Sequence, residues 1–129
     1  MSHYSQFVSK LNDIDSVRLA CEELGLSIRE NSTVRGYYSD NQSVKADFVV
    51  SWLGCQYEVG LVRDAKTGHF TLVYDTWQGN VEKKLGKGCI KLIESANFHK
   101  IAKKAKLKGY FINRRDNEKG IQMTLMKYA

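Results

Sequence analysis

The stretch ADFVVSWLGCQYEVGLVRDAKTGHFTLVYDTW, residues 46–77, decides the fold. Apolar and polar residues alternate in it, and this period of two is typical of strands that bury one face. Short turns containing glycine separate three such runs. The runs are 46–53, 56–63 and 69–77. The stretch therefore predicts a meander of three antiparallel strands.

Helical spacing occurs on both sides of this meander. Over residues 14–24, apolar residues recur every three or four positions, with Asp13 or Asp15 available to cap the start and Gly25 to cap the end. A longer helix is predicted over residues 89–107, after a segment that glycines punctuate.

Short strands complete the pattern. They are predicted over 3–11, 26–30 and 33–38, and as a closing hairpin over 110–115 and 121–128. The order is β-α-β-β-β-β-β-α-β-β, which indicates the α+β class. We expect one antiparallel sheet with both helices packed on one face. The 129 residues fit a single domain over residues 1–129.

The net charge of +6 is concentrated in one segment. Residues 81–115 hold nine lysines and two arginines against Glu82 and Glu94, whereas residues 1–80 are slightly acidic. Such asymmetry indicates either an anionic partner or a solvated lysine face. Lysine-rich contacts with phosphates would be weak and salt-dependent. The candidate anion-binding or nucleic-acid-binding residues are Lys100, Lys103, Lys104, Arg114 and Arg115.

No motif of a catalytic or metal site is present in the sequence. The three cysteines form no C-x-x-C pair, and the three histidines lack a second ligand at metal-binding spacing. LGKGCIKL (85–92) resembles a phosphate loop, but Val81 and Gly88 occupy positions that the motif needs as Gly and Ser or Thr. Two interpretations of this segment stay open: a weaker anion site at the start of the helix, or a flexible connection into the helix. We expect no enzymatic activity, no metal and no cofactor.

Neither a membrane span nor a secretion signal is indicated. No run approaches the ~20 apolar residues of a transmembrane helix. The opening residues lack a basic region followed by an apolar one, so we expect no signal peptide.

A family resemblance runs along most of the chain. Its most specific part is MSHYSQFVSKLNDIDSVRLACEELG (1–25), followed by Val34-Arg35-Gly36-Tyr37, residues 57–79 and Gly109-Tyr110. These segments resemble the hypothetical chloroplast reading frame thirty-five family, a cyanobacterial and plastid family of unknown function. The lysine-rich segment 80–108 departs from that pattern, as in a distant member carried by a phage or an alga.

The resemblance implies a location and a set of positions. The location is the cytoplasm of a cyanobacterial or phage-infected cell, or the chloroplast stroma. The family-like polar and aromatic positions lie at strand ends and could converge. They are His3, Tyr4, Arg35, Tyr37, Asp75 and Trp77.

Two functions fit these observations. The first is a small non-enzymatic accessory or adaptor protein that binds an unknown protein partner. The alternative is weak, nonspecific nucleic-acid binding through residues 83–115.

Overall fold

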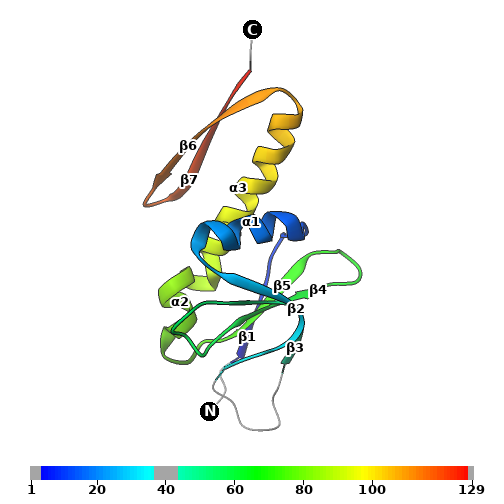
Figure 1. Cartoon of the computed structure of the whole chain (residues 1–129), viewed down its shortest axis with the longest axis vertical. Coiled ribbons are helices and arrows are strands. Elements are labelled where there is room, and N and C mark those ends of the chain that lie inside the picture. The colour runs from blue at the N-terminus through cyan, green and yellow to red at the C-terminus, as the bar shows by residue number, and fades with distance from the viewer. Residues whose placement is uncertain (1–3, 37–43, 128–129) are drawn as a thin grey trace.

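The computed structural model describes residues 4–36 and 44–127 (Figure 1). Within them, five strands form one antiparallel sheet in the order β1-β5-β4-β3-β2. The strands are β1 (Tyr4–Val8), β2 (Ser27–Val34), β3 (Val44–Ser51), β4 (Val59–Arg63) and β5 (Phe70–Asp75). The α+β class is confirmed.

The predicted meander forms the centre of this sheet. β3, β4 and β5 are consecutive and adjacent, and Phe48 lies opposite Leu61, which lies opposite Leu72. The predicted strand 26–30 and the first two residues of the predicted strand 33–38 form one strand, β2, which continues through Asn31 at φ 43°. Asparagine tolerates this left-handed conformation better than most residues, so the strand continues past it. The second prediction is wrong for residues 35–36, which lie beyond the end of β2, and residues 37–38 lie outside the described residues.

Helix α1 (Ile14–Leu24) begins and ends where its capping residues predict. The Asp13 side chain accepts a hydrogen bond from the Asp15 N–H, and Gly25 closes the helix at φ 70°. Val17, Ala20 and Cys21 are buried on its inner face. The 3.6-residue period of this segment therefore specifies which side of the helix meets the core.

Between β5 and the long helix, the glycine-punctuated segment is largely helical. It contains one-turn 3-10 helices η1 (Trp77–Gly79) and η2 (Lys87–Cys89) around the short helix α2 (Asn80–Leu85). Val81 and Leu85, four residues apart, are fully buried. The long helix α3 (Ile90–Leu107) agrees with the predicted 89–107 within one residue.

The prediction of a single sheet is wrong for the last hairpin. β6 (Tyr110–Asn117) and β7 (Gly120–Lys127) form a separate two-stranded sheet. Helix α3 has 18 residues and is therefore ~27 Å long, so it carries the chain away from the main sheet. The hairpin packs along α3 instead (Figure 1).

One face of the main sheet carries the core. Side chains of β3, β4 and β5 pack there against α1, α2 and the first turns of α3, which confirms that the predicted helices share a face. A smaller apolar cluster of Val34, Ala46 and Val49 lies apart from this core.

Candidate functional site

The three predicted lysines all lie on α3, but their surroundings differ. Lys103 and Lys104 are exposed. Lys100 is half-buried, and its ammonium group donates a hydrogen bond to Asn12 Oδ1 at 2.5 Å. Part of this lysine group therefore faces the main body of the protein.

Arg114 and Arg115 point to opposite faces of the hairpin, because successive side chains of a strand alternate. The Arg114 side chain is 25% exposed and turns towards α1 and α3. Arg115 is exposed on the other face. The five predicted basic residues therefore do not form one continuous surface.

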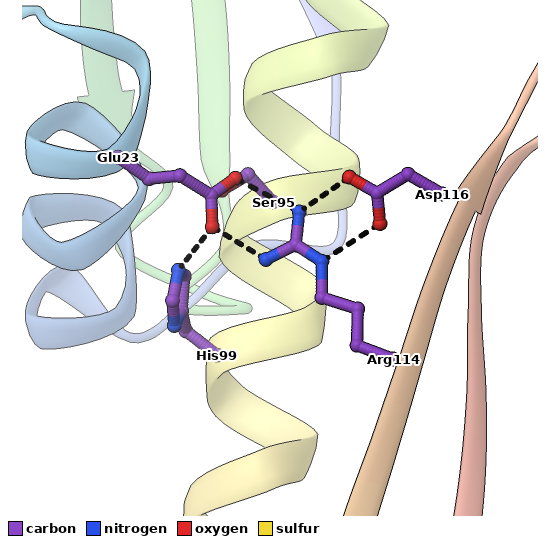
Figure 2. Close-up of polar contacts among 5 residues, drawn as sticks. All are labelled: Glu23, Ser95, His99, Arg114 and Asp116. Carbon is purple, nitrogen blue, oxygen red and sulfur yellow. Dashed lines mark hydrogen bonds and ion pairs between the residues drawn. The ribbon is translucent and has the colours of Figure 1, made fainter.

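Arg114 is the centre of a polar cluster that joins three elements (Figure 2). Its guanidinium donates to both carboxylate oxygens of Glu23 on α1, at 2.5 and 3.0 Å, and to Asp116 at 2.8 and 3.1 Å. The Ser95 hydroxyl donates to Glu23 at 3.0 Å, and His99 Nε2 lies 3.2 Å from it. We call these five residues the Glu23 cluster.

Hydrogen bonding favours the ionised forms of Glu23 and Arg114. The bonds from Arg114 lower the pKa of Glu23 from 4.5 to about 2, outweighing the effect of its partial burial. The bonds to Glu23 and Asp116 raise the pKa of Arg114 above its ordinary value. The cluster therefore fixes the hairpin to α1 and α3 by charge-assisted hydrogen bonds.

A cavity of about 600 Å³ lies beside the cluster, between α3 and β6. Its wall combines aromatic and basic side chains, and none of the described residues that line it is acidic. The Arg114 guanidinium stacks 4.4 Å from the centroid of the Phe98 ring and so holds part of this wall in place. We call this cavity the α3–β6 cleft. It is lined by Phe98, His99, Ala102, Lys106, Gly109, Tyr110, Phe111, Ile112 and Arg114.

The other side of the hairpin leaves a second groove, of about 420 Å³, against α3. Ile101 and Leu125 line it and are 48% and 43% exposed. Glu94 and Lys119 also line it, so its charges are mixed. The hairpin therefore covers only part of the apolar surface of α3.

The family-like positions are brought together only in part. Tyr4 lies opposite Asp75 in the register of β1 and β5, and Asp75 Oδ1 accepts a hydrogen bond from the Trp77 N–H at 2.8 Å. Arg35 is bound instead to Glu58, which directly precedes β4. His3 and Tyr37 lie outside the described residues.

Glu58 is a buried carboxylate that the sequence analysis missed. Its side chain is fully buried, and Arg29 donates to both of its oxygens at 2.7 Å. The Arg35 N–H donates at 2.8 Å, and Arg35 Nε lies 3.1 Å away. Burial alone would raise the pKa of Glu58, but these hydrogen bonds outweigh it and leave that pKa lowered. The Glu58 carboxylate therefore connects β2 to the start of β4. In the sequence, it could have been noticed as an acidic residue between the apolar residues Tyr57 and Val59.

Apart from Arg114, the cleft residues were also missed, although their spacing was visible. Phe98, Ala102 and Lys106 recur every four residues, and so lie on one face of the helix. Tyr110, Ile112 and Arg114 alternate along β6, and so share the face that meets it. Only the docking of the hairpin on α3 brings these two sets together.

Two further observations concern the described residues as a whole. None of the helices in residues 4–36 and 44–127 is long and apolar enough to cross a membrane. Within the same ranges, no group of three or more His, Cys, Asp or Glu side chains is placed to hold a metal ion.

Comparison with known proteins gave one match. Neither curated proteins nor solved structures matched the chain. A family model, described as "Protein of unknown function (DUF1257)", matches residues 20–126 and so includes the Glu23 cluster and the α3–β6 cleft. By this match, the chain belongs to the DUF1257 family of proteins of unknown function.

Proposed function

We propose that this chain is a non-enzymatic accessory protein that binds an acidic, partly apolar segment of another protein in the α3–β6 cleft. The observation that carries the proposal is the composition of the cleft wall. Phe98 and Tyr110 offer apolar contact area, and Lys106 and His99 stand beside them with no acidic side chain in the described lining. Aromatic residues beside a lysine suit a protein segment that carries both apolar and acidic side chains.

Nucleic acid is the second candidate, and the placement of the basic residues makes it the weaker one. Arg114 is bound to two carboxylates, and Arg115 lies on the other face of the hairpin. Affinity for nucleic acid depends on how many phosphates the protein neutralises. Lys103 and Lys104 are exposed and could supply a few such contacts, which would give weak and salt-sensitive binding.

The absence of catalysis is also part of the proposal. A cysteine nucleophile reacts as a thiolate. Burial raises the pKa of Cys21 to about 11 and that of Cys89 to about 12. Both side chains are at most 1% exposed, so they are poor candidates for attack on a substrate.

Site-specific photocrosslinking tests the proposal. A benzoyl-phenylalanine is placed at Tyr110, in the cleft, and in a control protein at Leu53, a fully exposed residue between β3 and β4. Each protein is irradiated in a cyanobacterial lysate, a source chosen because of the sequence resemblance. We expect a protein adduct at Tyr110, absent at Leu53, that survives nuclease treatment and is lost with Lys106→Glu. An adduct that nuclease removes would support nucleic acid instead, and equal adducts at both positions would contradict a cleft-specific partner.

A further inference from the structure

We infer that the partner segment binds as an added β-strand, pairing in extended form with the free edge of β6. This inference rests on the proposed function and specifies how the α3–β6 cleft is occupied. The occupant is an extended segment of another protein in which acidic and apolar residues alternate.

The first support is the unpaired edge itself. Within residues 4–36 and 44–127, β6 pairs with β7 alone. In an antiparallel pair, alternate residues direct their N–H and C=O groups away from the partner strand. Such an edge is a template for another strand. The edge of β6 is long for this purpose, since the strand has 8 residues.

The second support is the part of α3 that the hairpin leaves uncovered. Ile101 of α3 is 48% exposed, and a groove against α3 is left along the outer side of each strand of the hairpin. The α3–β6 cleft is the groove beside β6, and the consecutive residues Gly109–Ile112 line it. A third strand would lie over this groove and direct every second side chain into it.

Charge identifies the edge and the partner. Inward-pointing side chains of the added strand would meet Lys106, because His99 is already in contact with Glu23, and outward-pointing ones would lie near Arg115. The groove on the β7 side has both Glu94 and Lys119, so it offers an acidic strand no comparable preference. A second copy of this chain would carry the same basic residues, Lys106 and Arg115, beside its own β6 edge, and like charges across a strand pair are unfavourable.

A peptide of defined chemistry tests the inference without altering the protein. The probe is a short capped peptide in which glutamate alternates with valine. One control has every backbone amide N-methylated, which removes the donors that strand pairing needs, and the other has lysine in place of glutamate. Binding is measured by titration, and hydrogen exchange of the β6 amides is followed by NMR.

We expect the unmodified peptide to bind and to slow hydrogen exchange of alternate β6 amides by about tenfold or more. N-methylation should weaken binding by about tenfold or more, and the lysine peptide should not bind. If the methylated peptide binds equally well and the β6 amides are not protected, strand addition is wrong while cleft binding of a protein segment stands. If the glutamate peptide does not perturb α3 or β6 at all, both the inference and the proposed function fail. A dimer in solution that protects β6 without peptide would also overturn the inference.

Discussion

Arg114 on β6 holds Glu23 on α1 by two hydrogen bonds, at 2.5 and 3.0 Å, across 91 positions of the sequence. Two parallel bonds between a guanidinium and a carboxylate fix orientation as well as distance. Because the hairpin is not part of the main sheet, this pair is one of the contacts that set its angle to α3. It also places Arg114 over Phe98 and so shapes the wall of the α3–β6 cleft.

The pair should be energetically coupled. Exposed ion pairs contribute up to about 1 kcal/mol, and this one is two-pronged and partly buried, so we expect a coupling of about 1 kcal/mol between Glu23→Ala and Arg114→Ala. Urea unfolding of the two single variants and the double variant measures it. Arg115→Ala, on the outer face, is the matched control and should change stability by less than about 0.5 kcal/mol. Strict additivity of the two changes would mean that the pair does not anchor the hairpin.

The contribution of Glu23 should depend on pH in a defined window. Its pKa is lowered from 4.5 to about 2 in the folded protein. A carboxylate with a lowered pKa stabilises the fold fully above its unfolded pKa, and this stabilisation is lost as the pH falls through the folded value. The difference in melting temperature between wild type and Glu23→Gln should therefore shrink between about pH 4.5 and about pH 2. Glu22→Gln serves as the control for a neighbouring exposed carboxylate. If the difference in melting temperature between wild type and Glu23→Gln stays constant over this range, the pKa of Glu23 is not lowered by its contacts in the folded protein.

Local sequence patterns predicted the elements but not how the last hairpin docks. The alternation over 46–77 gave the meander because one face of each strand is buried. The same kind of alternation over 110–128 predicted a hairpin. This pattern is the same whether the hairpin joins the main sheet or forms a sheet of its own. Where the hairpin packs depends on the length of α3 and on the partner of Arg114. These are tertiary relations that no local period encodes.

No element is predicted from the sequence for residues 78–88, which the structure shows to be largely helical. Gly79, Gly86 and Gly88 all have positive φ, at 66°, 78° and 64°. They lie at the ends of α2 and within η2, so they mark where short helices begin and end. The buried Val81 and Leu85 were the competing helical signal, but two residues are too few to outweigh three glycines.

The candidate site shows the same division. That Arg114 and Arg115 point to opposite faces follows directly from strand alternation, and could have been predicted from the strand assignment. The ion pair between Glu23 and Arg114 could not have been predicted, because α1 and β6 are distant in sequence. The lysine-rich segment and the cleft lie in the same part of the chain, but lysine density alone did not identify the aromatic residues that line the cleft.

The three cysteines should differ in reactivity. Cys21 and Cys89 are 1% and 0% exposed, and burial raises their pKa values to about 11 and 12. Cys55 is half-buried, between β3 and β4. With Ellman's reagent, we expect one thiol to react quickly and two to react only as the protein opens. Cys55→Ser should abolish the fast phase, and a fast phase that persists would show that a core cysteine is accessible.

Removal of the Glu58 carboxylate should lower the free energy of unfolding substantially. Glu58→Ala would leave Arg29 without its two bonds at 2.7 Å and would remove the acceptor of the Arg35 N–H. Breaking a buried ion pair typically costs about 3–5 kcal/mol. Both arginine side chains are partly exposed and can turn to water, so we expect about 2–3 kcal/mol by urea unfolding. Asp47→Ala, which removes an exposed acceptor of the Arg63 N–H, is the matched control and should cost about 1 kcal/mol. If the two variants lose the same unfolding free energy, Glu58 does not stabilise the β2–β4 contact more than an exposed acceptor would.

Gly60 should not tolerate a side chain, for reasons of space alone. A Cβ there would lie 2.5 Å from Val34 Cγ2 and 3.0 Å from Ala46 Cβ, both in the smaller apolar cluster. Gly60→Ala reduces the entropy of the unfolded chain, which favours folding by about 0.4–1 kcal/mol. Overpacking costs about 1–3 kcal/mol, so we expect net destabilisation in urea unfolding. The double variant Gly60→Ala with Val34→Ala should be more stable than the sum of the single effects predicts, because the new methyl group enters space that Val34 vacates. Additive losses would show that the clash is relieved elsewhere in the sheet.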